Sequence, residues 1–213
     1  MASEGAERIA GALLAAAPVR SVILHGSATT DDFVPGVSDL DLLVVVDRPL
    51  DAGEIAALTA LIATTDVAPA GGIDLDVVTA ATAAVPSRTP PVELHLGRHP
   101  GTALEVAPKI AASPDLPAEL SMAREGYALL GSAPHAVLGP VDPAWLLARS
   151  EHWLTTWLAL LDDEDHAVFM VLTACRMWHY AVAGTHTSKT AAAHWALDRD
   201  PSQRKGGGAV VDL

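Results

Sequence analysis

The sequence predicts an α+β protein in which a small sheet with flanking helices comes first and an all-α helical domain follows. The first half alternates helical segments with short runs of β-branched and apolar residues, which are typical of buried strands. The second half is a series of amphipathic stretches with helical spacing. Half of the 213 residues are hydrophobic and 18% are charged, so the chain can bury a core and a disordered acidic chain is excluded.

Five elements are expected in the first 80 residues. Residues 3–17 space apolar side chains at helical intervals and end before Pro18. A second helix is expected over residues 51–64, because Asp51 can cap it and Glu54 stands three residues later. The β-branched and apolar runs predict three strands, at residues 19–25, 40–46 and 73–79.

The pattern changes at residue 80. Residues 81–117 contain many prolines and little periodicity, so we expect a loop-rich connection. Four helices are expected after it, over residues 117–130, 143–161, 164–183 and 188–197. Gly184 is the expected end of the third helix, and Ser188 is the candidate N-cap of the fourth. We place the domains at residues 1–105 and 106–200, followed by a loose tail at 201–213.

The chain is strongly acidic, since 13 basic and 26 acidic residues give a net charge of 13 − 26 = −13. Nucleic acid and anionic membranes require a basic surface, so neither is expected as a partner, whereas a cationic small molecule or a metal–nucleotide complex is compatible. Cys175 is the only cysteine, which excludes an internal disulfide and fits a reducing compartment. No segment has the length of a membrane span and the acidic N-terminus is unlike a secretory signal, so we expect a cytoplasmic protein, and we take it as a monomer.

A Gly-Ser pair followed by two aspartates carries the strongest chemical signal. Gly26 and Ser27 close the first strand, and Asp39 and Asp41 open the second after eleven intervening residues. Residues two apart in a strand point to the same face, roughly 6.6 Å apart along it, so both carboxylates can face metal ions about 3.5–4 Å apart. Mg²⁺ is the expected metal, because it takes a few carboxylates and completes its shell with water and phosphate oxygens.

Two further observations extend this site. Gly26 lets a phosphate approach the backbone, where N–H groups and the Ser27 hydroxyl can hold its oxygens. The third strand carries Asp74 and Asp76 on one face, and one of them can bridge a metal or act as a general base if this strand lies beside the second. An isolated Asp-x-Asp is often a solvated strand edge, but the full pattern is much rarer. It predicts two-metal nucleotidyl transfer.

The segment GSATTDDFVPGVSDLDLLVVV (26–46) resembles the signature of the polymerase-β-type nucleotidyltransferases, and more closely that of the streptomycin/spectinomycin adenylyltransferases. The resemblance continues through VELHLG (92–97) and LPAELSMAREGYALLG (116–131), and it is strongest over residues 166–197. It implies a nucleotidyltransferase-type mixed sheet that binds ATP and two Mg²⁺ ions, followed by a helical domain. The implied activity is transfer of AMP from ATP to a hydroxyl of an aminoglycoside antibiotic, which confers resistance.

The resemblance also implies roles for individual residues. Asp39, Asp41 and Asp76 are the implied metal-binding and catalytic residues, with Asp76 in the position of the family's catalytic glutamate. The nucleotide-binding residues are Gly26, Ser27, Ser38, Arg176 and Lys189. The implied residues of the aminoglycoside pocket are Trp157, Asp162, Asp165 and His99.

The chain also departs from the family pattern. Asp76 is one methylene shorter than glutamate, His99 stands where the family has a tryptophan, and His166 stands where it has a substrate-binding aspartate, with Asp165 adjacent. The chain also ends about a helix or two early for the family. Two alternatives therefore stay open: a nucleotidyltransferase of the same fold with a non-antibiotic acceptor, and a truncated, non-catalytic nucleotide-binding remnant. For Arg176, a buried structural ion pair is the alternative to phosphate binding.

Overall fold

The computed structural model describes residues 2–160, 162–164 and 166–200. The predicted tail at 201–213 lies outside the described residues. The backbone contacts divide the chain into two compact units, Met1–Val141 and Asp142–Leu213, and each is described by itself. Within the described part of the chain, every helix is too short or too polar to cross a lipid bilayer.

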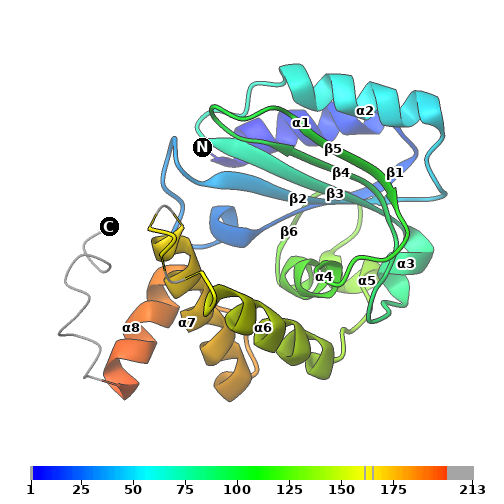
Figure 1. The fold of residues 1–213 in the computed structure, drawn as a ribbon. Helices are drawn as coiled ribbons and strands as arrows, with labels where there is room; N and C mark the ends of the chain where they lie inside the picture. Colours follow the sequence, from blue (N-terminus) through cyan, green and yellow to red (C-terminus); the bar gives the residue numbers. More distant parts are fainter. Residues whose placement is uncertain (1, 161, 165, 201–213) are drawn as a thin grey trace. The chain divides into compact units, whose positions relative to one another are not determined.

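The first unit is built on a mixed six-stranded sheet with the order β5-β4-β3-β2-β1-β6 (Figure 1). β2 and β3 pair in parallel, and the other neighbouring strands pair antiparallel. The three strands predicted from the sequence are confirmed as the centre of this sheet. The strands are β1 (Val19–His25), β2 (Asp39–Val46), β3 (Gly72–Thr79), β4 (Val92–Arg98), β5 (Glu105–Ile110) and β6 (Tyr127–Leu130).

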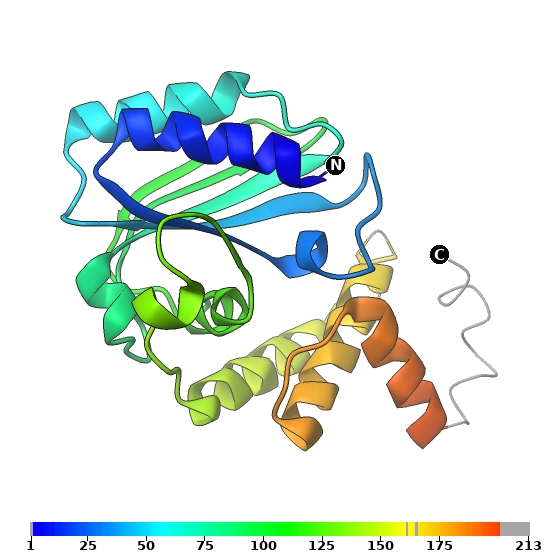
Figure 2. The same cartoon turned by 180° about the vertical axis from the view of Figure 1, so that it is seen from behind.

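Helices cover both faces of this sheet (Figures 1 and 2). One face carries α1 (Ala2–Ala16) and α2 (Ala52–Thr64), and the other carries α3 (Ala80–Ala84), α4 (Leu116–Arg124) and α5 (Pro134–Val137). Alternation along β2 explains the two cores, since successive side chains of a strand point to opposite faces. Leu42 and Val44 pack in the core with α1 and α2, whereas Leu43 and Val45 pack in the core with Leu120 of α4.

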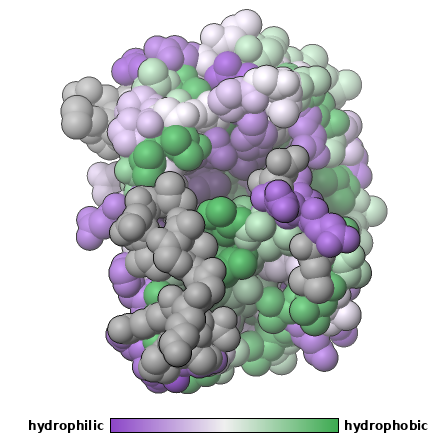
Figure 3. All heavy atoms as spheres, turned by 60° about the vertical axis from the view of Figure 1, so that its left-hand side comes forward, coloured by the Kyte–Doolittle hydropathy of each residue, from purple (hydrophilic) through white to green (hydrophobic). Residues whose placement is uncertain are grey.

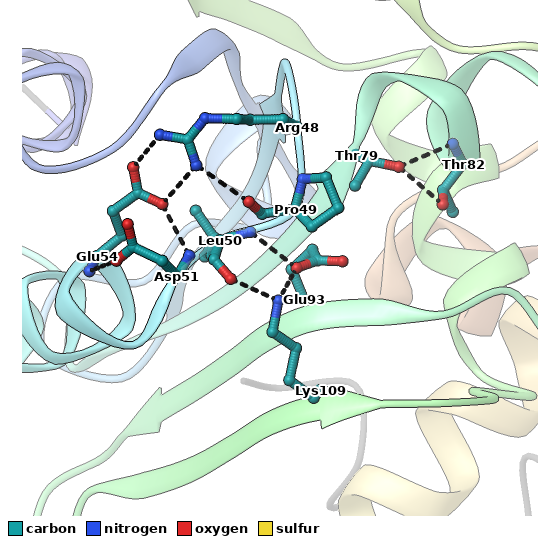
Figure 4. A network of polar contacts seen from close by, with 9 residues as sticks. All are labelled: Arg48, Pro49, Leu50, Asp51, Glu54, Thr79, Thr82, Glu93 and Lys109. Atoms are coloured by element: carbon teal, nitrogen blue, oxygen red, sulfur yellow. Dashed lines mark hydrogen bonds and ion pairs between the residues drawn. The ribbon is translucent and has the colours of Figure 1, made fainter.

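A polar network joins the N-terminus of α2 to the edge of the sheet (Figure 4). Asp51 accepts a hydrogen bond from the backbone N–H of Glu54 at 2.9 Å, and the Glu54 carboxylate accepts one from the backbone N–H of Asp51 at 2.9 Å. Glu93 of β4 accepts from the backbone N–H of Leu50 at 3.0 Å and pairs with Lys109 of β5, which donates to the Leu50 carbonyl at 2.7 Å. The predicted capping by Asp51 is therefore confirmed as a complete capping box.

The described residues of the second unit form three long helices, α6 (Pro143–Trp157), α7 (Ala167–Ala183) and α8 (Lys189–Arg199). The Ser188 hydroxyl accepts a hydrogen bond from the backbone N–H of Ala191 at 3.1 Å, which confirms the predicted N-cap of α8. Gly184 ends α7 with a left-handed φ of 70°, a conformation that glycine adopts without a steric cost. The helical region expected after the sheet is thus present.

Two regions differ from the sequence-based expectation. Residues 81–117, expected to be a loop-rich connection, contain β4 and β5, and the helix expected over 117–130 ends at Arg124 and is followed by β6. β5 contains Pro108 and β6 has only four residues, but both are edge strands, where proline and short length are tolerated. Because β5 pairs with β4 and β6 pairs with β1, the first unit continues past the domain limit predicted at residue 105.

Helix α7 keeps large apolar side chains at the surface. Phe169, Val171 and Val182 are 51%, 49% and 56% exposed. Figure 3 shows hydrophobic residues reaching the surface among hydrophilic ones on one face of the molecule. The described helices of the second unit therefore leave part of its apolar surface uncovered.

Candidate active site

Four aspartates line one face of the sheet where β2 and β3 begin. The parallel register places Asp41 beside Asp74 and Leu43 beside Asp76, so the aspartates of both strands share the face that carries Leu43 further along β2. Asp39 lies at the first position of β2, on the same face. The second and third predicted strands do lie side by side, which was the condition for Asp74 or Asp76 to reach the site, and both acidic pairs share one face.

Two histidines reach this acidic face from β4 and from the residue that follows it. His95 lies opposite Asp76 across the antiparallel β3–β4 pair, and its Nδ1 is 2.9 Å from Asp76 Oδ1. The ring of His99 lies between two carboxylates: Nδ1 is 3.4 Å from Asp39 Oδ2, and Nε2 is 3.2 Å from Asp74 Oδ1. The acidic cluster therefore contains imidazole nitrogens as well as carboxylate oxygens.

The histidines and the carboxylates shift one another's protonation. Burial raises the pKa of the Asp74 carboxyl, the charge of a protonated His99 opposes this shift, and the Asp39 carboxylate adds to it. The hydrogen bond with Asp76 raises the pKa of His95. The protonated forms of Asp74 and His95 are thus favoured on this face.

Glycines leave the space that two of the carboxylates occupy. A Cβ on Gly26 would lie 1.9 Å from Asp41 Oδ2, and a Cβ on Gly72 would lie 2.3 Å from Asp39 Oδ1. Gly26 also has a φ of +67°, which a residue with a side chain adopts only with strain. The sequence predicts Gly26 as a phosphate-binding glycine, and the structure adds a second role, because this glycine makes room for Asp41.

The two predicted serines lie at opposite ends of the β1–β2 connection. Ser27 lies in the short 3-10 helix η1 (Gly26–Thr29) that follows β1. Ser38 precedes β2, and its hydroxyl accepts a hydrogen bond from the backbone N–H of Val34 at 3.0 Å while its own N–H donates to the Val34 carbonyl at 2.9 Å. Ser38 therefore closes the loop that leads into the aspartates of β2.

The residues present fit a divalent cation. One donor atom from each of Asp39, Asp74 and His99 lies within 4.8 Å of the other two. Carboxylate oxygens and imidazole nitrogens are donors that divalent metal ions take in proteins. The three side chains are 32%, 38% and 36% exposed, which leaves room for water or phosphate oxygens at the same ion.

Aromatic residues organise the predicted site residues of the second unit. The Trp157 ring stacks on Trp153 with a centroid distance of 5.8 Å and meets Phe169 edge-on at 6.0 Å. Lys189 Nζ lies 4.9 Å from the centre of the Phe169 ring. Phe169, which no sequence motif marks, thus contacts one predicted substrate residue and one predicted nucleotide-binding residue.

The remaining predicted residues of this unit lie on or before α7. Arg176 is half-buried on α7, and Asp162 is exposed between α6 and α7. His166 Nδ1 lies 2.8 Å from Asp163 Oδ2, so the histidine at the family's aspartate position is paired with an acid of this chain. Asp165 lies outside the described residues.

Comparison with known proteins places the chain in a family. Residues 6–89 match the nucleotidyltransferase domain family, and residues 136–206 match the C-terminal domain family of aminoglycoside adenylyltransferases. The chain is 31% identical over 191 residues to the aminoglycoside (3'') (9) adenylyltransferases of Klebsiella pneumoniae and Escherichia coli, covering 86% of this chain and 72% of each relative. The chain belongs to the aminoglycoside adenylyltransferase family.

This adenylyltransferase also shares its fold with a solved relative. The crystal structure of spectinomycin adenyltransferase AAD(9) from Enterococcus faecialis, with ATP and spectinomycin, superposes with a TM-score of 0.67 at 19% identity. The match covers 95% of this chain and 84% of that one. The family and the α+β fold predicted from the sequence are both confirmed, and the enzyme is a nucleotidyltransferase.

Proposed function

We propose that this adenylyltransferase transfers AMP from ATP to a hydroxyl of a streptomycin- or spectinomycin-like aminoglycoside antibiotic and so confers resistance. The observation that carries the proposal is the row of aspartates on one face of β2 and β3, next to Gly26 and Ser27. The names of the relatives support the class of acceptor, and the ATP and spectinomycin bound to AAD(9) support the two substrates.

In the proposed reaction, the acceptor hydroxyl oxygen forms a bond to the α-phosphorus of ATP. The bond between that phosphorus and the oxygen leading to the β-phosphate breaks, and pyrophosphate leaves with the electron pair. Asp76 takes the hydroxyl proton, while His95, 2.9 Å away, fixes the orientation of this carboxylate. Two Mg²⁺ ions, held by Asp39, Asp41 and Asp76, would neutralise the triphosphate and the departing pyrophosphate.

The other predicted residues bind the two substrates. Backbone N–H groups near Gly26 and the hydroxyls of Ser27 and Ser38 hold phosphate oxygens, and Arg176 and Lys189 add positive charge for the triphosphate. The acceptor is bound through its positive charge and its ring. The residues proposed for it are Trp157, Asp162, Asp165 and His99.

The test is AMP transfer by the full chain. With ATP, Mg²⁺ and streptomycin or spectinomycin, we expect release of pyrophosphate and an acceptor that gains the mass of one AMP. Asp76→Asn should lower kcat by about 10²–10⁴, because it removes the proposed base and one carboxylate ligand of Mg²⁺. Glu7→Gln, which changes an exposed acid of α1, should leave kcat unchanged.

Two results would contradict this proposal. One is an Asp76→Asn variant as active as the wild type. The other is the absence of turnover with every aminoglycoside tested, and a thermal shift with ATP–Mg²⁺ in that case would support a non-catalytic remnant.

A second candidate keeps the chemistry and changes the acceptor. The family has a substrate-binding aspartate where this chain has His166, and His166 pairs with Asp163. This pairing occupies an acid that would otherwise attract a cationic antibiotic. Incubation with ATP and a panel of hydroxyl-bearing metabolites and proteins, scored by the gain of one AMP in mass, separates the candidates: labelling of these acceptors without any aminoglycoside favours the second.

A further inference from the structure

We propose that Phe169 is a positioning residue that holds Trp157 and Lys189 in place for binding of the two substrates. The proposal rests on the proposed function for the roles of these two residues, Trp157 toward the acceptor and Lys189 toward the triphosphate. The contacts that Phe169 makes with them do not depend on that function. Phe169 acts through these two neighbours and not through a substrate contact of its own.

The place of Phe169 in the helical unit is the first argument. Phe169 lies in the first turn of α7, whereas Trp157 ends α6 and Lys189 begins α8. The rings of Phe169 and Trp157 meet at an interplanar angle of 75° with their centroids 6.0 Å apart, and Lys189 Nζ lies 4.9 Å from the centre of the Phe169 ring. One side chain of α7 thus contacts a proposed binding residue of α6 and another of α8.

A row of side chains along α6 leads to this contact. Trp153 stacks on Trp157 with an interplanar angle of 24° and a centroid distance of 5.8 Å, and Arg149 Cζ lies 4.6 Å from the centre of the Trp153 ring. Residues four apart in a helix are neighbours on its surface, so these three side chains form one row. Phe169 is the ring that connects this row to Lys189.

The exposure of Phe169 separates this role from core packing. Its side chain is 51% exposed, and among the described residues it is not part of either buried core cluster. A half-exposed ring removes less apolar surface from water than a core phenylalanine does, so its replacement should leave the fold intact. The position of Phe169 is therefore explained better by its ring contacts than by burial.

An aliphatic side chain cannot make these ring contacts. The face of an aromatic ring is electronegative and its edge is positive, so a cation is attracted to the face and aromatic pairs favour an edge-to-face arrangement. Lys189 has a long side chain that loses rotamer freedom when it binds a phosphate. Partial ordering of this side chain on the Phe169 ring lowers the entropic cost of nucleotide binding, and the contact with Trp157 does the same for the acceptor.

Nuclear magnetic resonance of the full chain, with its lysines reductively ¹³C-methylated, tests the contact with Lys189 directly. The sequence contains three lysines, Lys109, Lys189 and Lys205, and Lys189→Arg identifies the signal of Lys189. We expect the ring current of Phe169 to shift this signal upfield. Phe169→Leu should remove the shift, whereas Phe169→Tyr keeps an aromatic ring and should retain it.

Binding and kinetic measurements test the positioning role. Phe169→Leu should raise the Kd for ATP–Mg²⁺ and the KM for streptomycin or spectinomycin by about two- to fivefold each, with kcat changed by less than about twofold. Phe169→Tyr should restore both values. Val171→Ala is the matched control, because Val171 is 49% exposed on the same helix and its substitution should leave Kd, KM and kcat unchanged.

Three outcomes would overturn the proposal: an unchanged Lys189 signal in Phe169→Leu, wild-type Kd and KM in Phe169→Leu, or a Phe169→Tyr variant as defective as Phe169→Leu. A wild type that binds ATP–Mg²⁺ without transferring AMP would reject the proposed function, and the Lys189 signal and the Kd would then decide the role of Phe169. AMP transfer by a Phe169→Leu variant with unchanged Kd and KM would reject the positioning role alone. Absence of ATP–Mg²⁺ binding by the wild type would reject both.

Discussion

At the scale of single residues, Gly26 meets two requirements that no other residue type meets at its position. Its φ of +67° lies in the left-handed region, and a Cβ there would lie 1.9 Å from Asp41 Oδ2. Gly101 has a similar φ of +76° but nothing within 4 Å of its Cβ position. Substitution of Gly101 therefore measures the cost of the left-handed backbone conformation alone. Substitution of Gly26 adds the cost of the steric clash between the new Cβ and Asp41.

We expect Gly101→Ala to lower the free energy of unfolding by about 1–2 kcal/mol, the cost of a left-handed alanine. Gly26→Ala should lower it by about 2–4 kcal/mol and also reduce adenylyl transfer, because Asp41 must move. Urea unfolding and the AMP-transfer assay measure the two effects. Equal destabilisation by both substitutions, with full activity in Gly26→Ala, would contradict the prediction. It would show that Asp41 can move away from an alanine Cβ at position 26 without loss of function.

The shared face of Asp39 and Asp41 could be predicted from the sequence, whereas the resemblance implied a place for His99 in the aminoglycoside pocket and no sequence pattern assigned His95 to the site. Asp39 and Asp41 share a face because of the strand period alone, whereas the position of Asp74 and Asp76 beside them depends on the pairing of β2 with β3, which the sequence left as a condition. The contacts of His95 and His99 depend instead on the register of β4, which the proline-rich stretch around it concealed. The buried positions Val92, Leu94 and Leu96 alternate in β4, and this period of two was the available signal.

At the scale of elements, the sequence of each segment predicted the central strands and the capped helix ends. The edge strands β5 and β6 depend instead on pairing with a neighbouring strand. β1, β2 and β3 are apolar enough to be recognised alone, and the side chains of Asp51 and Ser188 cap their helices as predicted. β5 and β6 were missed because an edge strand requires neither apolar continuity nor an unbroken row of donors. Their existence depends on the neighbouring strand rather than on their own residues.

The capping box of α2 gives the prediction for this scale. Asp51→Ala removes the acceptor for the backbone N–H of Glu54, so we expect it to lower the free energy of unfolding by about 1 kcal/mol. Glu7→Ala, which removes an exposed carboxylate from α1, should change it by no more than about 0.5 kcal/mol. Urea unfolding followed by far-UV circular dichroism measures both. A loss of the same size in both variants would attribute the effect to charge rather than to capping.

At the scale of the whole molecule, each compact unit contains one histidine that resists protonation. Burial lowers the pKa of His25 in the first unit to about 4, against the opposing charge of Asp76. Burial also lowers the pKa of His186 in the second unit to about 4, and the positive charge of Arg176 contributes. All five tryptophans belong to the second unit, so tryptophan fluorescence follows the unfolding of that unit.

The acid stability of the second unit follows from His186. Between its unfolded pKa of 6.5 and its folded pKa of about 4, the unfolded chain binds more protons than the folded chain, so stability increases with pH in this window. On acidification, protonation of His186 in the unfolded chain therefore lowers the free energy of unfolding by at most about 3 kcal/mol between pH 6.5 and 4, and by nothing further below pH 4.

His186→Gln should flatten this part of the dependence of the urea midpoint on pH, measured by tryptophan fluorescence. His194→Gln, which changes an exposed histidine of α8, should retain the wild-type slope. A His186→Gln variant with the same slope as the wild type would show that the acid sensitivity of this unit arises elsewhere.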